Sequence, residues 1–159
     1  MLYQQDMVDA VSSIHAQISA FCDTGFALAI HIRYTRPSLL YRTYQQPWID
    51  HYSEKGFMLT DPVVHWGLMN TGMVWWDDLA DQDPAGVLRD ARAFGLLNGW
   101  TYSMGEAASR TISGITRSGP AFTETEVQHI IALTHEAHTL TMGIESFAPE
   151  VMEALRALG

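Results

Sequence analysis

The hydrophobic spacing changes sharply between the first two segments of the chain, and this change constrains the fold more than any other feature. Residues 5–22 place apolar side chains every three or four positions, which predicts an amphipathic helix. Residues 26–33 instead alternate large apolar side chains with small or polar ones, and a period of two is typical of a β-strand. A helix followed so closely by a strand indicates a layered α+β domain.

The rest of the chain adds elements of both kinds. Further strands are predicted over 39–44, 100–104 and 110–117. Further helices are predicted over 47–55, after Asp61-Pro62, after Asp83-Pro84, from the capping box Thr123–Glu126, and over 149–158. A chain of 159 residues fits one domain, and the order helix, strands, helices, strands, helix predicts one layered core.

Charge and cysteine content exclude several classes of protein. The chain carries nine Lys and Arg against eighteen Asp and Glu, a formal charge of −9, and no basic run. Because clustered cations bind phosphate backbones, we expect no direct contact with nucleic acid. No apolar run is long enough to span a membrane. The single cysteine, Cys22, is typical of a reducing compartment, so the expected location is the cytoplasm.

Charged residues are scarce and large aromatic residues are frequent. Charged side chains make up 17% of the chain, below the roughly 25% that is usual for globular domains. Five Trp and six Tyr suit pockets and interfaces, because these side chains combine apolar area with a polar group. We therefore expect a partner, such as a second subunit, to cover part of the surface.

A spaced set of aromatic, acidic and small residues occupies the middle of the chain. Its members are Tyr44, Trp48, Tyr52, Asp61-Pro62 and Trp76, followed by Gly95, Gly99 and Ser113. Four positions separate Trp48 from Tyr52, nine separate Tyr52 from Asp61, and fifteen separate Asp61 from Trp76. This pattern resembles the autoinducer-binding domain of LuxR-type quorum-sensing regulators, and the resemblance extends over about residues 20–140.

The resemblance implies both a fold and a function. The expected fold is an α-β-α sandwich with a central antiparallel sheet, similar to PAS and GAF domains. Residues 1–145 would form the ligand-binding domain and 146–159 a terminal helix or the start of a linker, with no helix-turn-helix DNA-binding domain within the 159 residues. The expected ligand is an N-acyl homoserine lactone, with no cofactor and no metal. The expected protein partner is a second copy or a full-length regulator.

The resemblance also assigns roles to individual residues. Trp48 would donate its indole N–H to the lactone carbonyl, and the Asp61 carboxylate would accept the amide N–H. Tyr44, helped by Ser113, would donate to the amide carbonyl, while Trp76 packs on the lactone ring. Tyr52 would lie along the first part of the acyl chain. These residue types suit the ligand because an indole only donates hydrogen bonds and an ionised carboxylate only accepts them.

The acyl tail of such a ligand needs apolar surroundings. The candidates to line this part of the pocket are Leu28, Ile30, Leu40, Val63, Val64 and Thr111. Alternation does not reveal which strand face meets the ligand, because both faces of the sheet are covered in a sandwich. Leu88 stands where family members often place an aromatic residue over the lactone, which indicates an unusual acyl group or fewer polar contacts.

Each of these residues also has an ordinary structural role open to it. Trp48 and Trp76 would suit a core, and Asp61 before a proline is a typical helix cap, a role compatible with ligand binding. Tyr44 could donate to a backbone carbonyl, and Ser113 could be a simple strand residue. The joint spacing favours a pocket over these separate roles.

Neither a catalytic motif nor a metal motif is present, so an enzyme is not expected. The sequence contains no G-x-S-x-G, Walker or H-E-x-x-H pattern. His129, His135 and His138 share one predicted helix but lack further ligands, so we expect them to face solvent. Two alternatives stay open: a dimerisation module with an empty pocket that inhibits a full-length regulator, and, least favoured, a lactone-cleaving enzyme.

Overall fold

Five strands form one antiparallel sheet at the centre of the protein, in the order β2-β1-β5-β4-β3. The computed structural model describes residues 2–159. The strands are β1 (Phe26–Arg33), β2 (Arg36–Arg42), β3 (Gly72–Trp75), β4 (Trp100–Met104) and β5 (Arg110–Ile115). The two outer strands are therefore β2 and β3, and the three inner strands carry most of the sheet's buried surface.

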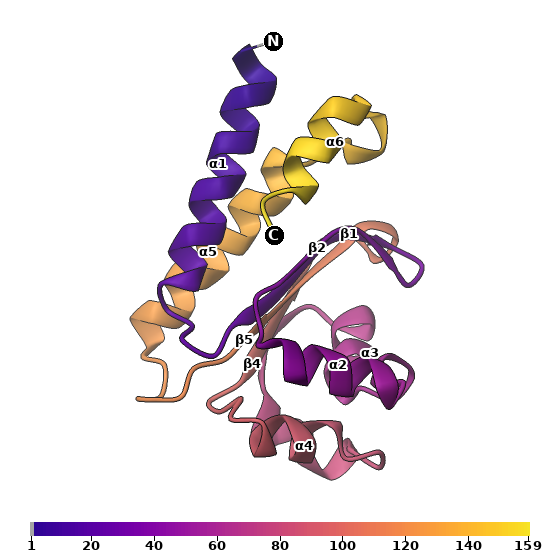
Figure 1. Cartoon of the computed structure of the whole chain (residues 1–159), viewed down its shortest axis with the longest axis vertical. Helices are drawn as coiled ribbons and strands as arrows, with labels where there is room; N and C mark the ends of the chain where they lie inside the picture. Colours follow the sequence, from indigo (N-terminus) through magenta and orange to yellow (C-terminus); the bar gives the residue numbers. More distant parts are fainter. Residues whose placement is uncertain (1) are drawn as a thin grey trace.

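Helices cover both faces of this sheet (Figure 1). One layer consists of α1 (Leu2–Ser19), α5 (Glu124–Leu140) and α6 (Pro149–Arg156), with the short 3-10 helix η4 (Ile144–Ser146) between the last two. The other layer consists of α2 (Gln46–Glu54), η1 (Phe57–Leu59), α3 (Pro62–Met69), η2 (Trp76–Gln82) and α4 (Val87–Ala93). One more 3-10 helix, η3 (Ala107–Ser109), joins β4 to β5. The predicted α-β-α sandwich is confirmed.

Most predicted elements form, and two differ for identifiable reasons. Strand β3 was not predicted, because its four residues show no alternation of buried and exposed side chains. Helix α4 begins at Val87 and not at Pro84. The Asp83 carboxylate reaches forward over the left-handed Gly86 and accepts hydrogen bonds from the backbone N–H groups of three helical residues, Val87, Leu88 and Arg89.

The two faces of β1 carry side chains of very different size. Phe26, Leu28 and Ile30 point into the core beneath α1, α5 and α6. Ala27 and Ala29 alternate with them and face the opposite layer, where both stay half-buried although the strand is an inner one. The register shifts between Ala29 and Ile32, where His31 adopts a positive φ of 50°, and this bulge returns Ile32 to the face of the alanines.

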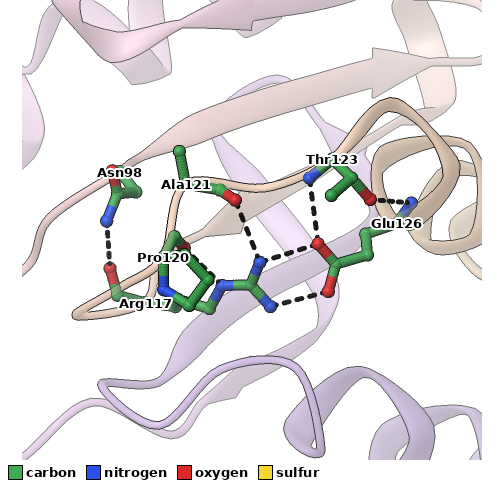
Figure 2. A network of polar contacts seen from close by, with 6 residues as sticks. All are labelled: Asn98, Arg117, Pro120, Ala121, Thr123 and Glu126. Carbon is green, nitrogen blue, oxygen red and sulfur yellow. Dashed lines mark hydrogen bonds and ion pairs between the residues drawn. The ribbon is translucent and has the colours of Figure 1, made fainter.

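Arg117 connects the end of the sheet to the start of α5 (Figure 2). Its guanidinium donates two hydrogen bonds to the Glu126 carboxylate, at 2.7 and 2.8 Å, and others to the carbonyls of Pro120 and Ala121. Glu126 also accepts from the backbone N–H of Thr123, which confirms the predicted capping box. The pairing with Arg117 lowers the pKa of Glu126 to about 2. The network fixes the first turn of α5 against the strand that precedes it.

The C-terminal segment packs on the same core as the rest of the chain. Val151 and Leu155 of α6 are buried in the cluster formed by α1, α5 and the sheet. The Tyr41 hydroxyl donates to the Leu155 carbonyl at 2.7 Å, which ties α6 to β2. Within residues 2–159, no helix has the length and apolar character needed to cross a membrane.

Candidate ligand-binding site

A cavity of about 200 Å³ lies between the sheet and the layer of α2, α3 and α4. Of the residues predicted for the site, nine line it: Leu40, Tyr44, Trp48, Tyr52, Asp61, Val63, Val64, Trp76 and Leu88. These residues come from strand β2, helices α2, α3 and α4, the 3-10 helix η2 and the segments between them. Positions almost fifty residues apart in the sequence thus meet around one hollow space.

Part of the cavity floor consists of residues with little or no side chain. Ala27 and Gly114 are paired across β1 and β5, and Ala29 is paired with Ile112. A Cβ atom at position 114 would lie 3.3 Å from the Tyr44 hydroxyl oxygen and 3.8 Å from the indole ring of Trp76. Small residues on this face therefore leave room above the sheet.

Aromatic rings form the wall on the side of α2. Trp48 is 6% exposed and packs edge-to-face with Tyr52, one turn later, at a centroid distance of 5.8 Å. This pairing follows from their spacing, because residues four apart lie on one face of a helix. Among residues 2–159, the indole N–H of Trp48 makes no hydrogen bond, and the side chain borders the cavity. A hydrogen-bond donor is thus left free at this wall.

Asp61 connects α2 to the start of α3. Its carboxylate accepts the Val63 backbone N–H and the Tyr52 hydroxyl, both at 2.8 Å, so it does cap α3. The side chain is 8% exposed, and burial raises the pKa of the carboxyl group. Burial and the neighbouring Asp61 charge raise the pKa of the Tyr52 phenol, which stays protonated and donates. Because a carboxylate offers about four lone-pair sites, Asp61 can accept further hydrogen bonds.

Tyr44 and Trp76 close the cavity against the sheet. The Tyr44 hydroxyl donates to the Gly114 carbonyl at 3.3 Å, the backbone contact that the sequence left open. The Trp76 indole donates to the Thr101 hydroxyl at 2.9 Å, so only its ring faces the cavity. Gly99 lies directly beneath this ring, and a Cβ there would collide with it. Gly99, the second glycine of the spaced set, thus leaves room for the Trp76 ring to pack on the backbone.

Ser113 and Thr111 lie on the wrong face of the sheet for the predicted role. Alternation along β5 directs Ile112 and Gly114 to the cavity and the two hydroxyl residues to α5. Ser113 accepts a 3.5 Å hydrogen bond from Thr134, and Thr111 contacts His138 at 2.7 Å. The expectation that they contact the ligand is therefore corrected.

The tail-lining expectation for β1 is corrected in the same way. Leu28 and Ile30 pack beneath the helices of the other layer, whereas Ala27, Ala29 and Ile32 line the cavity. Alternation along β1 does not say which of its two faces meets the ligand, because both faces of the sheet are covered. The signal that could have identified the floor is the size difference between the two alternating sets, because a strand face of alanines leaves space that a face of leucines fills.

His138 is buried, which corrects the expectation that the α5 histidines all face solvent; His129 and His135 are exposed. His31 contacts the His138 carbonyl through Nε2 at 3.0 Å, and the Thr111 hydroxyl accepts the His31 backbone N–H and contacts Nδ1 of His138. Burial lowers the pKa of His138 to about 4. No cluster of three metal-binding side chains occurs in the described part of the chain, 2–159.

Comparisons with known proteins identify the family to which the chain belongs. The family model described as the autoinducer binding domain matches residues 9–140. The transcriptional activator protein SolR of Ralstonia nicotianae is 25% identical over 163 residues, a match that covers 97% of this chain and 68% of SolR. The chain thus spans about two thirds of the length of this relative.

Two solved structures share the fold. The structure of Escherichia coli SdiA superposes with a TM-score of 0.68 and 22% identity, covering 90% of this chain and 65% of SdiA. The structure of CepR2 from Burkholderia cenocepacia, described as an N-acylhomoserine lactone dependent LuxR family transcription factor, gives 0.65 and 17%, covering 92% and 98%. The chain belongs to the autoinducer-binding domain family, the ligand-binding regulatory module of LuxR-type quorum-sensing transcriptional regulators and not an enzyme family.

Proposed function

We propose that this chain binds an N-acyl homoserine lactone in the cavity between the sheet and α2–α4. The observation that carries the proposal is the gathering of a free indole N–H, a buried carboxylate and a phenol around one largely apolar space. CepR2, which shares the fold, is described as dependent on N-acylhomoserine lactone, and that dependence supports the choice of ligand.

Each polar atom of the ligand has a suitable partner in this arrangement. The Trp48 N–H, which lacks a partner among residues 2–159, donates to the lactone carbonyl. The Asp61 carboxylate can accept a further hydrogen bond from the ligand's amide N–H. The Tyr44 hydroxyl can donate to the ligand's amide carbonyl in place of its 3.3 Å hydrogen bond to the Gly114 carbonyl. Leaving any of these ligand groups buried without a partner costs on the order of 1–3 kcal/mol, so the complete set selects this head group.

Ser113 and Thr111 are not part of the proposed site, because both face α5. Val63, Leu88 and Leu40 supply apolar surface around the acyl chain, and Tyr52 holds Asp61 in place through its 2.8 Å hydrogen bond. Trp76 contributes the flat face of its ring, since its N–H already binds Thr101. No cofactor takes part in this function.

The proposal is tested by titration calorimetry with N-acyl homoserine lactones of several chain lengths. Trp48→Phe keeps an aromatic ring and removes the donor, so we expect binding about tenfold weaker than in the unchanged protein. Trp75→Phe is the matched control, because Trp75 is 37% exposed and is not one of the cavity-lining residues. Absence of binding by every lactone, or equal affinity in both variants, would contradict the proposal.

We further propose that the domain acts as a dimer in the cytoplasm, either with itself or with a full-length regulator. The low content of charged residues, 17%, supports this proposal, because subunit interfaces are poor in charge. Native mass spectrometry, with and without lactone, separates the possibilities. A ligand-bound species supports sensing, an empty dimer supports the alternative of a dimerisation module, and a strictly monomeric protein rules out self-association.

A further inference from the structure

The cavity reaches solvent beside the edge strand β2. Leu40 and Met58 both line the cavity and are each 45% exposed, and the exposed Thr35 and Arg42 line it too, so the space opens along the edge formed by β2 and η1. Leu40 belongs to β2, an edge strand with only β1 beside it, and Met58 belongs to η1. Trp48 and Asp61, at the polar wall, are by contrast almost completely buried. If the ligand's head group binds Trp48 and Asp61, its acyl chain can reach solvent where Leu40 and Met58 line the opening.

The enclosed space is small for a complete acyl lactone. The cavity volume is about 200 Å³. Pockets for drug-sized ligands usually measure about 300–1,000 Å³, and a cavity of about 150 Å³ accommodates a single benzene. A five-membered lactone, its amide and the first few methylene groups would already fill the space. The rest of a longer acyl chain has to lie outside it.

We propose that the distal part of a long acyl chain leaves the cavity through this opening and lies on Leu40 and Met58. The ligands of this protein then include N-acyl homoserine lactones whose chains are longer than the cavity, and no sharp upper limit on chain length exists. The inference rests on the proposed function and adds to it the class of acyl chain. Both side chains are apolar, so the methylene groups of the acyl chain that lie on them are removed from water on one side.

The dependence of affinity on chain length distinguishes an open cavity from a closed one. A fully buried methylene improves affinity about fourfold, while one that lies half-buried at the opening gains about twofold or less. We expect affinity to rise steeply for the short chains and then to level off. A closed cavity would instead give a steep loss once the chain exceeds the space, because overfilling a packed interior forces its walls apart.

Calorimetry with straight-chain lactones from butanoyl to tetradecanoyl tests the inference on the unmodified protein. We expect the tetradecanoyl compound to bind within about tenfold of the tightest ligand. A larger loss at the long end would overturn the inference and leave the proposed function intact. Absence of binding at every length would instead remove the proposed function itself, so the two failures are distinguishable.

A pair of variants locates the path of the chain. Leu40→Arg places a charge at the opening and should lower the ratio of tetradecanoyl to butanoyl affinity about tenfold. Leu59→Arg is the matched control, because Leu59 is 80% exposed and is not one of the cavity-lining residues. Met58→Gln replaces Leu40→Arg if circular dichroism shows that the latter does not fold. An unchanged ratio in the folded variant would overturn the inference.

Discussion

The two faces of the central sheet use the same strands in opposite ways. Toward α1, α5 and α6, strand β1 presents Phe26, Leu28 and Ile30, all of which are fully buried. Toward α2, α3 and α4, the same strand presents Ala27 and Ala29, above which the cavity lies. The first face is filled with side chains and supports folding. The second is left hollow, and a hollow of this kind stabilises the protein only when a ligand occupies it.

Polar groups differ between the faces as well. Beneath α5, the Thr111 hydroxyl accepts the His31 backbone N–H and contacts Nδ1 of His138, and the His31 ring contacts the His138 carbonyl, so these groups are paired within the protein. Around the cavity, the Trp48 indole N–H makes no hydrogen bond among residues 2–159, and Asp61 can accept further bonds. The filled face also holds a donor that is unpaired within the described part of the chain, the indole N–H of Trp100, but that group is buried in the core, whereas the Trp48 side chain lines the cavity and is accessible to a ligand. The comparison leads to predictions that separate stability from binding.

Shortening a side chain on the filled face should have the largest effect. Leu28→Ala leaves a cavity beneath the helices and should lower the free energy of unfolding by about 2–5 kcal/mol. Urea denaturation of the ligand-free protein measures the change. Leu40→Ala, on the neighbouring strand but 45% exposed, is the control and should change stability by less than about 0.5 kcal/mol. Similar effects of the two substitutions would contradict the contrast between the faces.

Enlarging a side chain on the hollow face should affect binding more than stability. Ala29→Leu fills part of the cavity and should weaken lactone binding about a hundredfold, because the acyl chain and the new side chain compete for one space. Calorimetry measures the affinity. Ala132→Leu on the exposed surface of α5 serves as the control. Retained affinity in Ala29→Leu would show that the ligand does not lie above this strand.

Removing the charged acceptor at the polar wall should have an intermediate effect. Asp61→Asn should weaken lactone binding by about 1–3 kcal/mol, because a neutral amide oxygen is a poorer acceptor for the ligand's N–H. Asp78→Asn, an exposed position on η2, controls for the loss of one negative charge. Thermal-shift assays with and without ligand check folding and binding together. If only the unliganded stability changes, Asp61 acts as a helix cap alone.

The buried histidine pair predicts a loss of stability in acid. The folded protein disfavours protonation of His138, whose pKa falls from 6.5 to about 4 through burial and then through the neighbouring His31 and His135. Burial also lowers the pKa of His31, against the His138 carbonyl and Glu145, while Arg33 adds to the lowering. Because both folded pKa values lie below the unfolded ones, this stability is complete above pH 6.5 and is lost as the pH falls toward 4.

Melting temperatures recorded across this pH range test the histidine pair. His138→Gln should flatten the dependence between pH 6.5 and 4, while the exposed His129→Gln should leave it unchanged. The effect on lactone affinity at neutral pH should be the smallest of this series, since both rings lie on the filled face of the sheet. A flattened curve in the His129 variant would assign the pH dependence elsewhere.

The sequence was sufficient to predict the elements whose signals are local. The bounds of β1 and β4 agree with the alternation of their side chains, and the capping box begins α5 at the predicted turn. Strand β3 escaped prediction because four residues on an edge give too short a pattern. Trp48 and Tyr52 could be placed together, because four positions on a helix put both side chains on one face.

The sequence could not predict which face of each strand meets the cavity, and this explains the errors at the site. Alternation separates Ser113 from Gly114, but it does not say which set meets α5 and which meets the cavity. The bulge at His31 also changes which face of the sheet the following residue points to, and no residue of β1 predicts this bulge. Burial of His138 depends on contacts with residues far away in the chain.

By itself, the sequence determined the helices, most strands, the family and the residues that give the cavity its polar wall, because hydrophobic period, capping and spacing act within short stretches of chain. Only the tertiary structure decided that Ala27, Ala29 and Gly114 form part of the cavity floor, that Ser113 and Thr111 turn away from it, and that the cavity is open at Leu40. The physical reason is that an empty space and its opening are properties of two packed layers, and no single segment contains both.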